Sequence, residues 1–272
     1  MPAPHRSQSG TRIREFEGIV TEKHAVMGDS WLITFTAPED ILRAARPGQF
    51  VNVLPRERSV YDPVLRRPFS VYNAAPEEGL MTILVRPYGR GANWIVERGV
   101  GMEIDILGLL GNTFEVSPKS THLLMVGGGV GAAPLLMLAR EAVAQGKSVT
   151  YLLGAANAPA LLDAAEFPDE VEYVVATEDG SAGYHGFVTD LVPEYLQWAD
   201  QVFACGPGPM FQSLRNVILH HRMGKRPSVQ VSVERTMACG VGACLGCMVE
   251  TRRGMKTSCV EGPVFDMEAL VW

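Results

Sequence analysis

The chain has 272 residues, of which 47% are apolar and 20% charged, and its formal net charge is −6. This length suits two or three domains, and the composition is typical of a soluble globular protein. The negative charge argues against a nucleic-acid partner, because phosphate binding needs a basic surface.

Residues 1–13 lack the apolar core of a signal peptide, so we expect a flexible N-terminal tail and a cytoplasmic protein. The longest apolar run, residues 121–139, is interrupted by four glycines and a proline, so no membrane helix is expected. A reducing cytosol also disfavours disulfides, which leaves the cysteines available for other chemistry.

Residues 14–117 predict an antiparallel β-barrel. Short runs rich in β-branched and aromatic residues recur here about every dozen residues, separated by Gly, Pro and Asp. The expected strands are residues 16–26, 30–38, 48–55, 66–74 and 80–87. A short helix is expected over residues 91–99.

Residues 118–226 predict a Rossmann-like domain, because apolar strands alternate here with helices. Such alternation indicates a parallel sheet with helices on both faces. The expected strands are residues 122–126, 148–155, 171–177 and 201–206, and the expected helices are residues 132–146, 186–197 and 209–222. Residues 227–272 then form a third, small domain, which needs a metal or a partner to hold it together.

A glycine-rich loop separates the first strand and helix of the Rossmann-like domain. Gly127, Gly129 and Ala132 satisfy a G-x-G-x-x-A pattern, and Gly129, Gly131 and Pro134 satisfy G-x-G-x-x-P. The helix that follows offers free amides and a positive dipole end to a pyrophosphate. This context favours nucleotide binding over a merely tight turn.

The same domain offers hints about the nucleotide. No Arg or Lys lies between Gly154 and Glu170 to meet a 2′-phosphate, which favours NAD over NADP. Cys205 ends an apolar strand, where parallel sheets face their ligand crevice, so it is a candidate contact of the nicotinamide. A buried, unreactive cysteine is the alternative. No acid–base pair suggests a catalytic residue.

Four of the five cysteines lie in the cysteine segment, which we define as residues 237–260. The spacing is Cys239-x4-Cys244-x2-Cys247-x11-Cys259. A C-x4-C-x2-C start with a fourth cysteine further on is the plant-type [2Fe–2S] pattern, and it predicts these four as metal ligands. Zinc is the alternative, but zinc sites usually pair two C-x2-C knuckles, and only one is present.

In the barrel, Arg67 precedes an aromatic and a hydroxyl residue, and a turn with two glycines opens the predicted helix. An arginine beside a helix N-terminus can hold a diphosphate. The alternative is a surface arginine and an ordinary turn.

Together, "RRPFS", "GRGAN", "GGGVGAAP", "CGPGPM" and the four-cysteine segment resemble the ferredoxin–NADP reductase superfamily. More narrowly, they resemble the electron-transfer subunits of type B dihydroorotate dehydrogenase. The resemblance runs from about residue 14 to the C-terminus. It implies that the barrel binds FAD, that the Rossmann-like domain binds NAD and that the last domain binds [2Fe–2S].

The resemblance also implies which barrel residues hold FAD. The R-P-x-S strand of the family corresponds to Arg67, Pro68, Phe69 and Ser70. The next strand, Leu84, Val85 and Arg86, lines the flavin ring. Gly91 and Ala92 hold the diphosphate, and Ala92 replaces a hydroxyl residue found in many relatives, which makes that contact backbone-only.

A nicotinamide exchanges two electrons and a [2Fe–2S] cluster one, so a flavin must stand between them. The resemblance implies a partner, the FMN-containing catalytic subunit that oxidises dihydroorotate to orotate in pyrimidine biosynthesis, with two copies of each subunit in a heterotetramer. Electrons would pass through [2Fe–2S] and FAD to NAD+. One alternative is a reductase subunit of sulfide dehydrogenase, ferredoxin:NADP oxidoreductase or hydrogenase (its gamma subunit). Another is a redox-sensing module without turnover.

Overall fold

The computed structural model describes residues 13–221 and 227–272, so the predicted tail of residues 1–13 lies almost wholly outside the described residues. The described residues form two compact units. The first holds the residues up to Thr113, together with Arg235–Val249 and Met255–Pro263. The second holds Phe114–Glu234, Glu250–Gly254 and Val264–Trp272.

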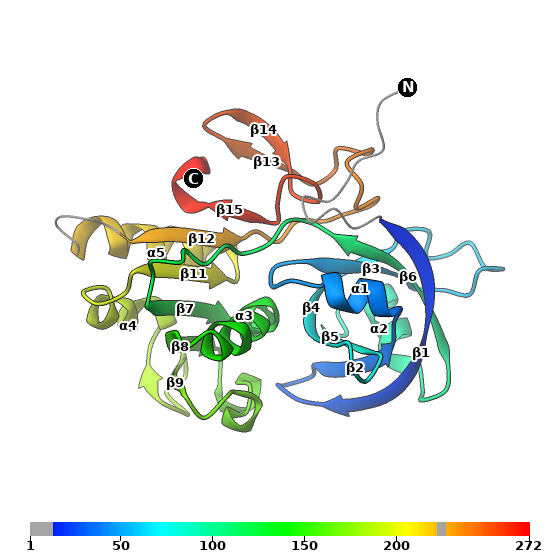
Figure 1. The fold of residues 1–272 in the computed structure, drawn as a ribbon, viewed down its shortest axis with the longest axis horizontal. Coiled ribbons are helices and arrows are strands. Elements are labelled where there is room, and N and C mark those ends of the chain that lie inside the picture. Colours follow the sequence, from blue (N-terminus) through cyan, green and yellow to red (C-terminus); the bar gives the residue numbers. More distant parts are fainter. Residues whose placement is uncertain (1–12, 222–226) are drawn as a thin grey trace. The chain divides into compact units, whose positions relative to one another are not determined.

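The first unit contains a closed barrel of six strands, which confirms the predicted antiparallel barrel (Figure 1). In spatial order the strands are β1 (Arg14–Ala25), β2 (Trp31–Thr36), β5 (Leu80–Val85), β4 (Arg67–Ala75), β3 (Phe50–Leu54) and β6 (Glu103–Leu110). Two helices accompany them, α1 (Glu39–Ala44) and the predicted α2 (Arg90–Glu97). Strand β6 closes the barrel by pairing with β1 and β3, and the sequence analysis missed it.

Alternation explains why these segments form a barrel. In β1, Phe16 and Val20 are buried, whereas the residues beside them face solvent. Gly18 continues the buried face, and a Cβ there would lie 2.8 Å from the Thr36 carbonyl oxygen. Period-2 burial of this kind marks strands with one face on a core. The alternating apolar residues of β1 therefore determine which face of the strand points into the barrel.

The second unit contains a seven-stranded sheet. In spatial order its strands are β10 (Tyr184–His185), β9 (Val171–Thr177), β8 (Ser148–Ala155), β7 (His122–Gly128), β11 (Gln201–Cys205), β12 (Ser228–Ser232) and β15 (Val264–Asp266). All neighbouring pairs are parallel except β12 and β15. The chain reverses its direction across the sheet between β7 and β11, the position at which such sheets bind ligands.

Helices cover both faces of this sheet, as predicted. They are α3 (Ala132–Ala144), α4 (Val188–Tyr195) and α5 (Gly208–His221). In β8, Tyr151 donates a hydrogen bond to the carbonyl of Ala132 in α3, whereas Gly154 lies against Val188 of α4. Residues an odd number of positions apart in a strand point to opposite faces. Helices α3 and α4 therefore lie on opposite sides, and α4 packs against α5.

The C-terminal residues contribute a two-stranded sheet of β13 (Met248–Thr251) and β14 (Gly254–Thr257). The described residues also contain the 3-10 helices η1 (Gly129–Gly131), η2 (Ala158–Ala160), η3 (Ala164–Glu166) and η4 (Met267–Ala269). Strands β12 and β15 extend the sheet of the second unit. The predicted boundaries at residues 13/14, 117/118 and 226/227 stay a prediction. No helix among the described residues is long and apolar enough to cross a membrane.

Candidate cofactor-binding sites

The four cysteines of the cysteine segment come together in the first unit as two pairs. The backbone N–H of Cys244 donates to Cys239 Sγ at 3.5 Å, and Cys247 and Cys259 are buried in one apolar cluster. None of them forms a disulfide. Each iron of a [2Fe–2S] cluster takes two protein thiolates, so two adjacent pairs are the arrangement that this cluster needs. In the described part of the chain, no three Cys, His, Asp or Glu side chains surround a single ion position.

The backbone of the cysteine segment points N–H groups at the sulfurs. Val241 N lies 3.4 Å from Cys239 Sγ, and Gly242 N lies 3.3 Å from Cys259 Sγ. The amide of Cys244 also reaches Cys239 Sγ, at 3.5 Å. Gly242 has a φ of +77°, in the region that favours glycine, which lets the loop turn its amides inward. Such amides stabilise the negative charge of thiolates and of a cluster.

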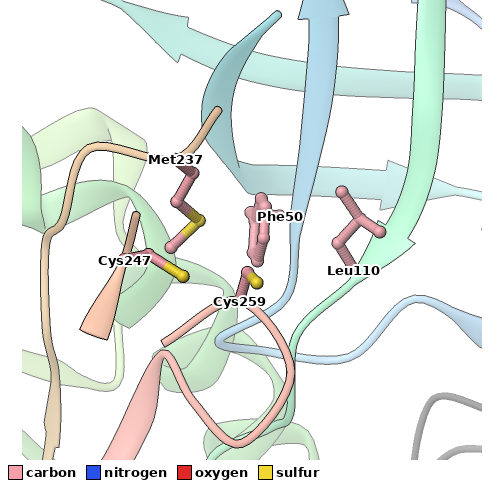
Figure 2. Close-up of a cluster of buried hydrophobic side chains, with 5 residues drawn as sticks. All are labelled: Phe50, Leu110, Met237, Cys247 and Cys259. Atoms are coloured by element: carbon pink, nitrogen blue, oxygen red, sulfur yellow. The ribbon is translucent and has the colours of Figure 1, made fainter. Parts of the chain in front are cut away.

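Two of the cysteines are anchored in apolar packing. Figure 2 shows Phe50 of β3 and Leu110 of β6 facing Met237, Cys247 and Cys259, and all five side chains are buried. Strand β3 also pairs with β4, which carries the predicted FAD-binding residues Arg67 to Ser70. The cysteine segment therefore packs against the strand next to β4. Cys244, by contrast, is exposed.

The environments of the thiols differ. Burial opposes ionisation of Cys239, but N–H donors from Val241 and Cys244 outweigh it and lower its pKa to about 7. For Cys259, burial and then the hydrogen bond with the Cys247 thiol raise the pKa to about 12. Of Cys239 and Cys259, Cys239 is therefore the thiol that ionises more readily.

A first prediction follows for protein stripped of iron by a chelator. Because the pKa of Cys239 is lowered and that of Cys259 is raised, iodoacetamide at pH 7 should label Cys239 at least about tenfold faster than Cys259. Mass spectrometry of the labelled peptides measures both rates. Cys205, buried in the second unit, serves as the unlabelled control. Equal rates at Cys239 and Cys259 would contradict the assigned environments.

The predicted flavin residues surround the N-terminus of α2. The Arg67 side chain lies against Gly91, where a Cβ would stand 2.8 Å from Arg67 Nε. Gly91 and Ala92 are buried in the first turn of α2, and Arg67 is half-buried. A guanidinium beside free helix amides provides the charge and donors that a diphosphate requires, so these residues fit the group.

The remaining predicted flavin residues divide into two groups. Pro68, Phe69 and Ser70 are half-buried on β4. Leu84 and Val85, at the end of β5, are buried. The structure does not bring Arg86 into the group, because it follows the strand and its exposed side chain binds Asp29 at 3.0 Å.

The glycine-rich loop lies at the reversal point of the parallel sheet. Gly131 packs so closely on β11 that a Cβ would stand 2.2 Å from the Cys205 carbonyl oxygen. Gly129 has a φ of +55°, and no atom lies within 4 Å of where its Cβ would be. Gly127 packs its α-carbon beside Tyr151. One glycine therefore serves close packing and another leaves the backbone open, which fits a pyrophosphate.

Cys205 ends β11 in register with Gly127 on one side and Ser232 on the other. Its side chain is buried, and burial followed by the charge of Glu234 raises the pKa of the thiol, so it stays protonated. Its contact with a nicotinamide stays a prediction. Sequence reasoning missed Glu234, because nothing in the sequence shows that the residues after β12 approach the end of β11.

Comparisons with known proteins agree with this arrangement. The family profile "Iron-sulfur cluster binding domain of dihydroorotate dehydrogenase B" matches residues 234–271. The chain is 35% identical over 264 residues to the "Dihydroorotate dehydrogenase B (NAD(+)), electron transfer subunit" of Desulforamulus reducens, covering 94% of this chain and 98% of that one. It is 38% identical to the subunit of the same name from Bacillus caldolyticus, over 81% of this chain and 84% of that one.

A solved structure is similar over nearly the whole chain. It is the NADH-dependent reduced ferredoxin-NADP oxidoreductase described in a study of flavin-based electron bifurcation. The TM-score is 0.81 at 30% identity, covering 94% of this chain and 90% of that one.

Proposed function

The chain belongs to the family of electron transfer subunits of dihydroorotate dehydrogenase B, and we propose that it relays electrons from a partner FMN dehydrogenase to NAD+. The partner oxidises dihydroorotate to orotate, and the two subunits form a heterotetramer with two copies of each. The relay uses a [2Fe–2S] cluster and FAD, both held by this chain. A cytoplasmic location fits, because cluster assembly needs reduced cysteines and the cytosol keeps thiols reduced.

One observation carries this proposal: a single strand connects the two predicted redox sites of the first unit. Strand β3 pairs with β4, so that Val53 lies opposite Arg67 and Phe50 opposite Ser70. From the same strand, Phe50 packs against Cys247 and Cys259. Electron transfer requires cofactors that are close and rigidly held, and a shared strand supplies both.

In the proposed assignment, Cys239 and Cys244 hold one iron, and Cys247 and Cys259 hold the other. The contact of Cys244 N with Cys239 Sγ and the shared burial of Cys247 and Cys259 support this division. The amides that point at the sulfurs of Cys239 and Cys259 compensate the negative charge of the group.

Arg67 and the N-terminus of α2, with Gly91 and Ala92, bind the FAD diphosphate. Phe69 and Ser70 contact the flavin ring, together with the backbone of Leu84 and Val85. Their half-buried or strand-end positions support this assignment. Since Arg86 binds Asp29, we assign it no contact with the ring through its side chain.

The segment from Gly127, near the end of β7, to Gly131, the last residue of η1, binds the NAD pyrophosphate, supported by the open backbone at Gly129. Bound FAD supplies the ability to exchange two electrons with a nicotinamide and single electrons with a cluster. The chain itself binds and orients, and Cys205, protonated and buried, adds no charge beside the nicotinamide. Hydride transfer requires no acid–base pair from the protein.

A second prediction tests this function. Purified protein should contain about one FAD and two irons per chain, and NADH should bleach both absorbances under anaerobic conditions. Absorbance spectroscopy and metal analysis measure this. A colourless protein with one zinc would contradict the proposal, as would a flavoprotein that NADH leaves oxidised.

The partner is tested separately, because the similar solved structure is a ferredoxin-NADP oxidoreductase. Affinity purification from native cells should recover an FMN protein, and the complex should reduce NAD+ with dihydroorotate. Recovery of a hydrogenase or a ferredoxin-linked complex without dihydroorotate activity would favour the alternative, with the relay chemistry unchanged.

A further inference from the structure

Asn52, in the middle of β3, carries a side chain that the proposed function has not used. It is fully buried, and neither Nδ2 nor Oδ1 has a hydrogen-bond partner in the structure. The backbone of Asn52 pairs with β4 and β6, and its carbonyl also accepts a hydrogen bond from Arg66 Nη1 at 3.4 Å. A buried amide with both ends unpaired is costly and rare, and it calls for a partner such as a water or a bound group.

The register of β3 shows where this side chain points. Alternate residues of a strand share a face, so Asn52 lies on the same face as Phe50. Phe50 packs against Cys247 and Cys259, so this face is turned toward the cysteine segment. Val51 and Val53 occupy the opposite face, and a Cβ on Gly108 would touch the Val51 side chain.

The cysteine segment approaches Asn52 at Gly240. A Cβ on Gly240 would stand 2.3 Å from Asn52 Nδ2, and the φ of Gly240 is +74°. Only glycine avoids both the clash and the strain. The amide therefore rests on the backbone of the residue after Cys239.

The sulfur atoms near Gly240 indicate which group could be the hydrogen-bond partner of the Asn52 side chain. Cys239 Sγ already accepts N–H groups from Val241 and Cys244 of its own loop. Sulfur atoms of thiolates and clusters only accept, so the end of the Asn52 amide turned toward them must be its NH2 group. Asn52 approaches this loop from strand β3 of the barrel, at Gly240.

We propose that the Asn52 side chain donates a hydrogen bond to sulfur at the Cys239 side of the [2Fe–2S] cluster and thereby raises the reduction potential of the cluster. A donor to sulfur stabilises the reduced form, which carries one more negative charge. Asn52 pairs in register with Pro68 of β4, so the same residue is fixed to the flavin strand. Asn52 thus contacts the cluster directly from a strand that pairs with β4, an inference that rests on the proposed presence of the cluster.

The test uses the full chain with both cofactors, reduced by dithionite, and needs no turnover. Protein labelled with 15N at the asparagine amides should show a 15N coupling to the reduced cluster in pulsed EPR. Asn52→Leu, which keeps the volume without the donor, should abolish this coupling. Asn52→Leu should also lower the ratio of reduced to oxidised cluster about tenfold at a fixed potential. This corresponds to a reduction potential about 59 mV lower for a one-electron couple.

Thr34→Val provides the matched control, because Thr34 is also a buried polar residue of the barrel, hydrogen-bonded to Thr82 at 2.9 Å. It should lower stability without moving the coupling or the potential. Absence of 15N coupling in the wild-type protein overturns the inference, even if Asn52→Leu fails to fold. Coupling that survives in Asn52→Leu overturns it too. A protein with no [2Fe–2S] EPR signal would instead defeat the proposed function.

Discussion

Replacing Cys259 by serine is expected to leave a chain that still accepts electrons from NADH but no longer passes them to its partner. Cys259 is buried beside Phe50 and Cys247, and in the proposed assignment its loss removes one of the two ligands of the same iron. Loss of groups that merely support a metal ligand costs about 10–100-fold in metal affinity. Loss of a ligand is therefore expected to lower partner reduction by more than about 100-fold.

Two assays separate the relay into its steps. NADH-dependent reduction of ferricyanide, which flavin alone supports, should stay within about twofold of wild type. Iron content and the EPR signal of the reduced cluster should disappear. Cys205→Ser is the control, because Cys205 is equally buried but lies in the second unit. It should keep two irons per chain, and full partner reduction by Cys259→Ser would refute the ligand assignment.

The sequence predicted those parts of the molecule whose chemistry is local. The alternation in β1 and the glycine-rich motif at the end of β7 can each be recognised within a dozen residues. The reason is that burial along a strand and access to a helix N-terminus both depend on residues that are close in sequence. The cysteine spacing is of the same kind. It predicts the ligand set because a loop around a cluster has few possible lengths.

The parts that the sequence did not reveal depend on contacts between distant segments. Strand β15 pairs antiparallel with β12, and β6 closes the barrel. In the sequence, each is only a short apolar run between loops, and nothing in it shows which strand it pairs with. Asn52 looks like an ordinary polar residue of a strand until Gly240, far along the chain, is placed against it. Arg86 shows the reverse case, because only the fold reveals that Asp29 engages its side chain.

Replacing Arg67 by alanine is expected to produce a protein largely free of FAD. The guanidinium lies at the N-terminus of α2, against Gly91, and truncating one side of a charged, hydrogen-bonded pair costs about 2–4 kcal/mol, roughly 30–1000-fold in Kd. Flavin titration of the apoprotein followed by fluorescence measures this. Arg43→Ala, an exposed arginine paired with Glu39 and Glu77, should bind FAD like wild type.

Gly91→Ala separates flavin binding from folding, because its two effects have opposite signs. Gly91 lies in α2 without a positive φ, so alanine there favours the helix by about 0.5–1 kcal/mol. The new Cβ, however, would stand 2.8 Å from Arg67 Nε and displaces that flexible side chain from the helix N-terminus. We therefore expect an apoprotein at least as stable as wild type with FAD affinity lowered about tenfold. Gly99→Ala, where no atom lies within 4 Å of the Cβ position, should change neither quantity, and unaltered FAD binding by Gly91→Ala would remove Arg67 from the diphosphate site.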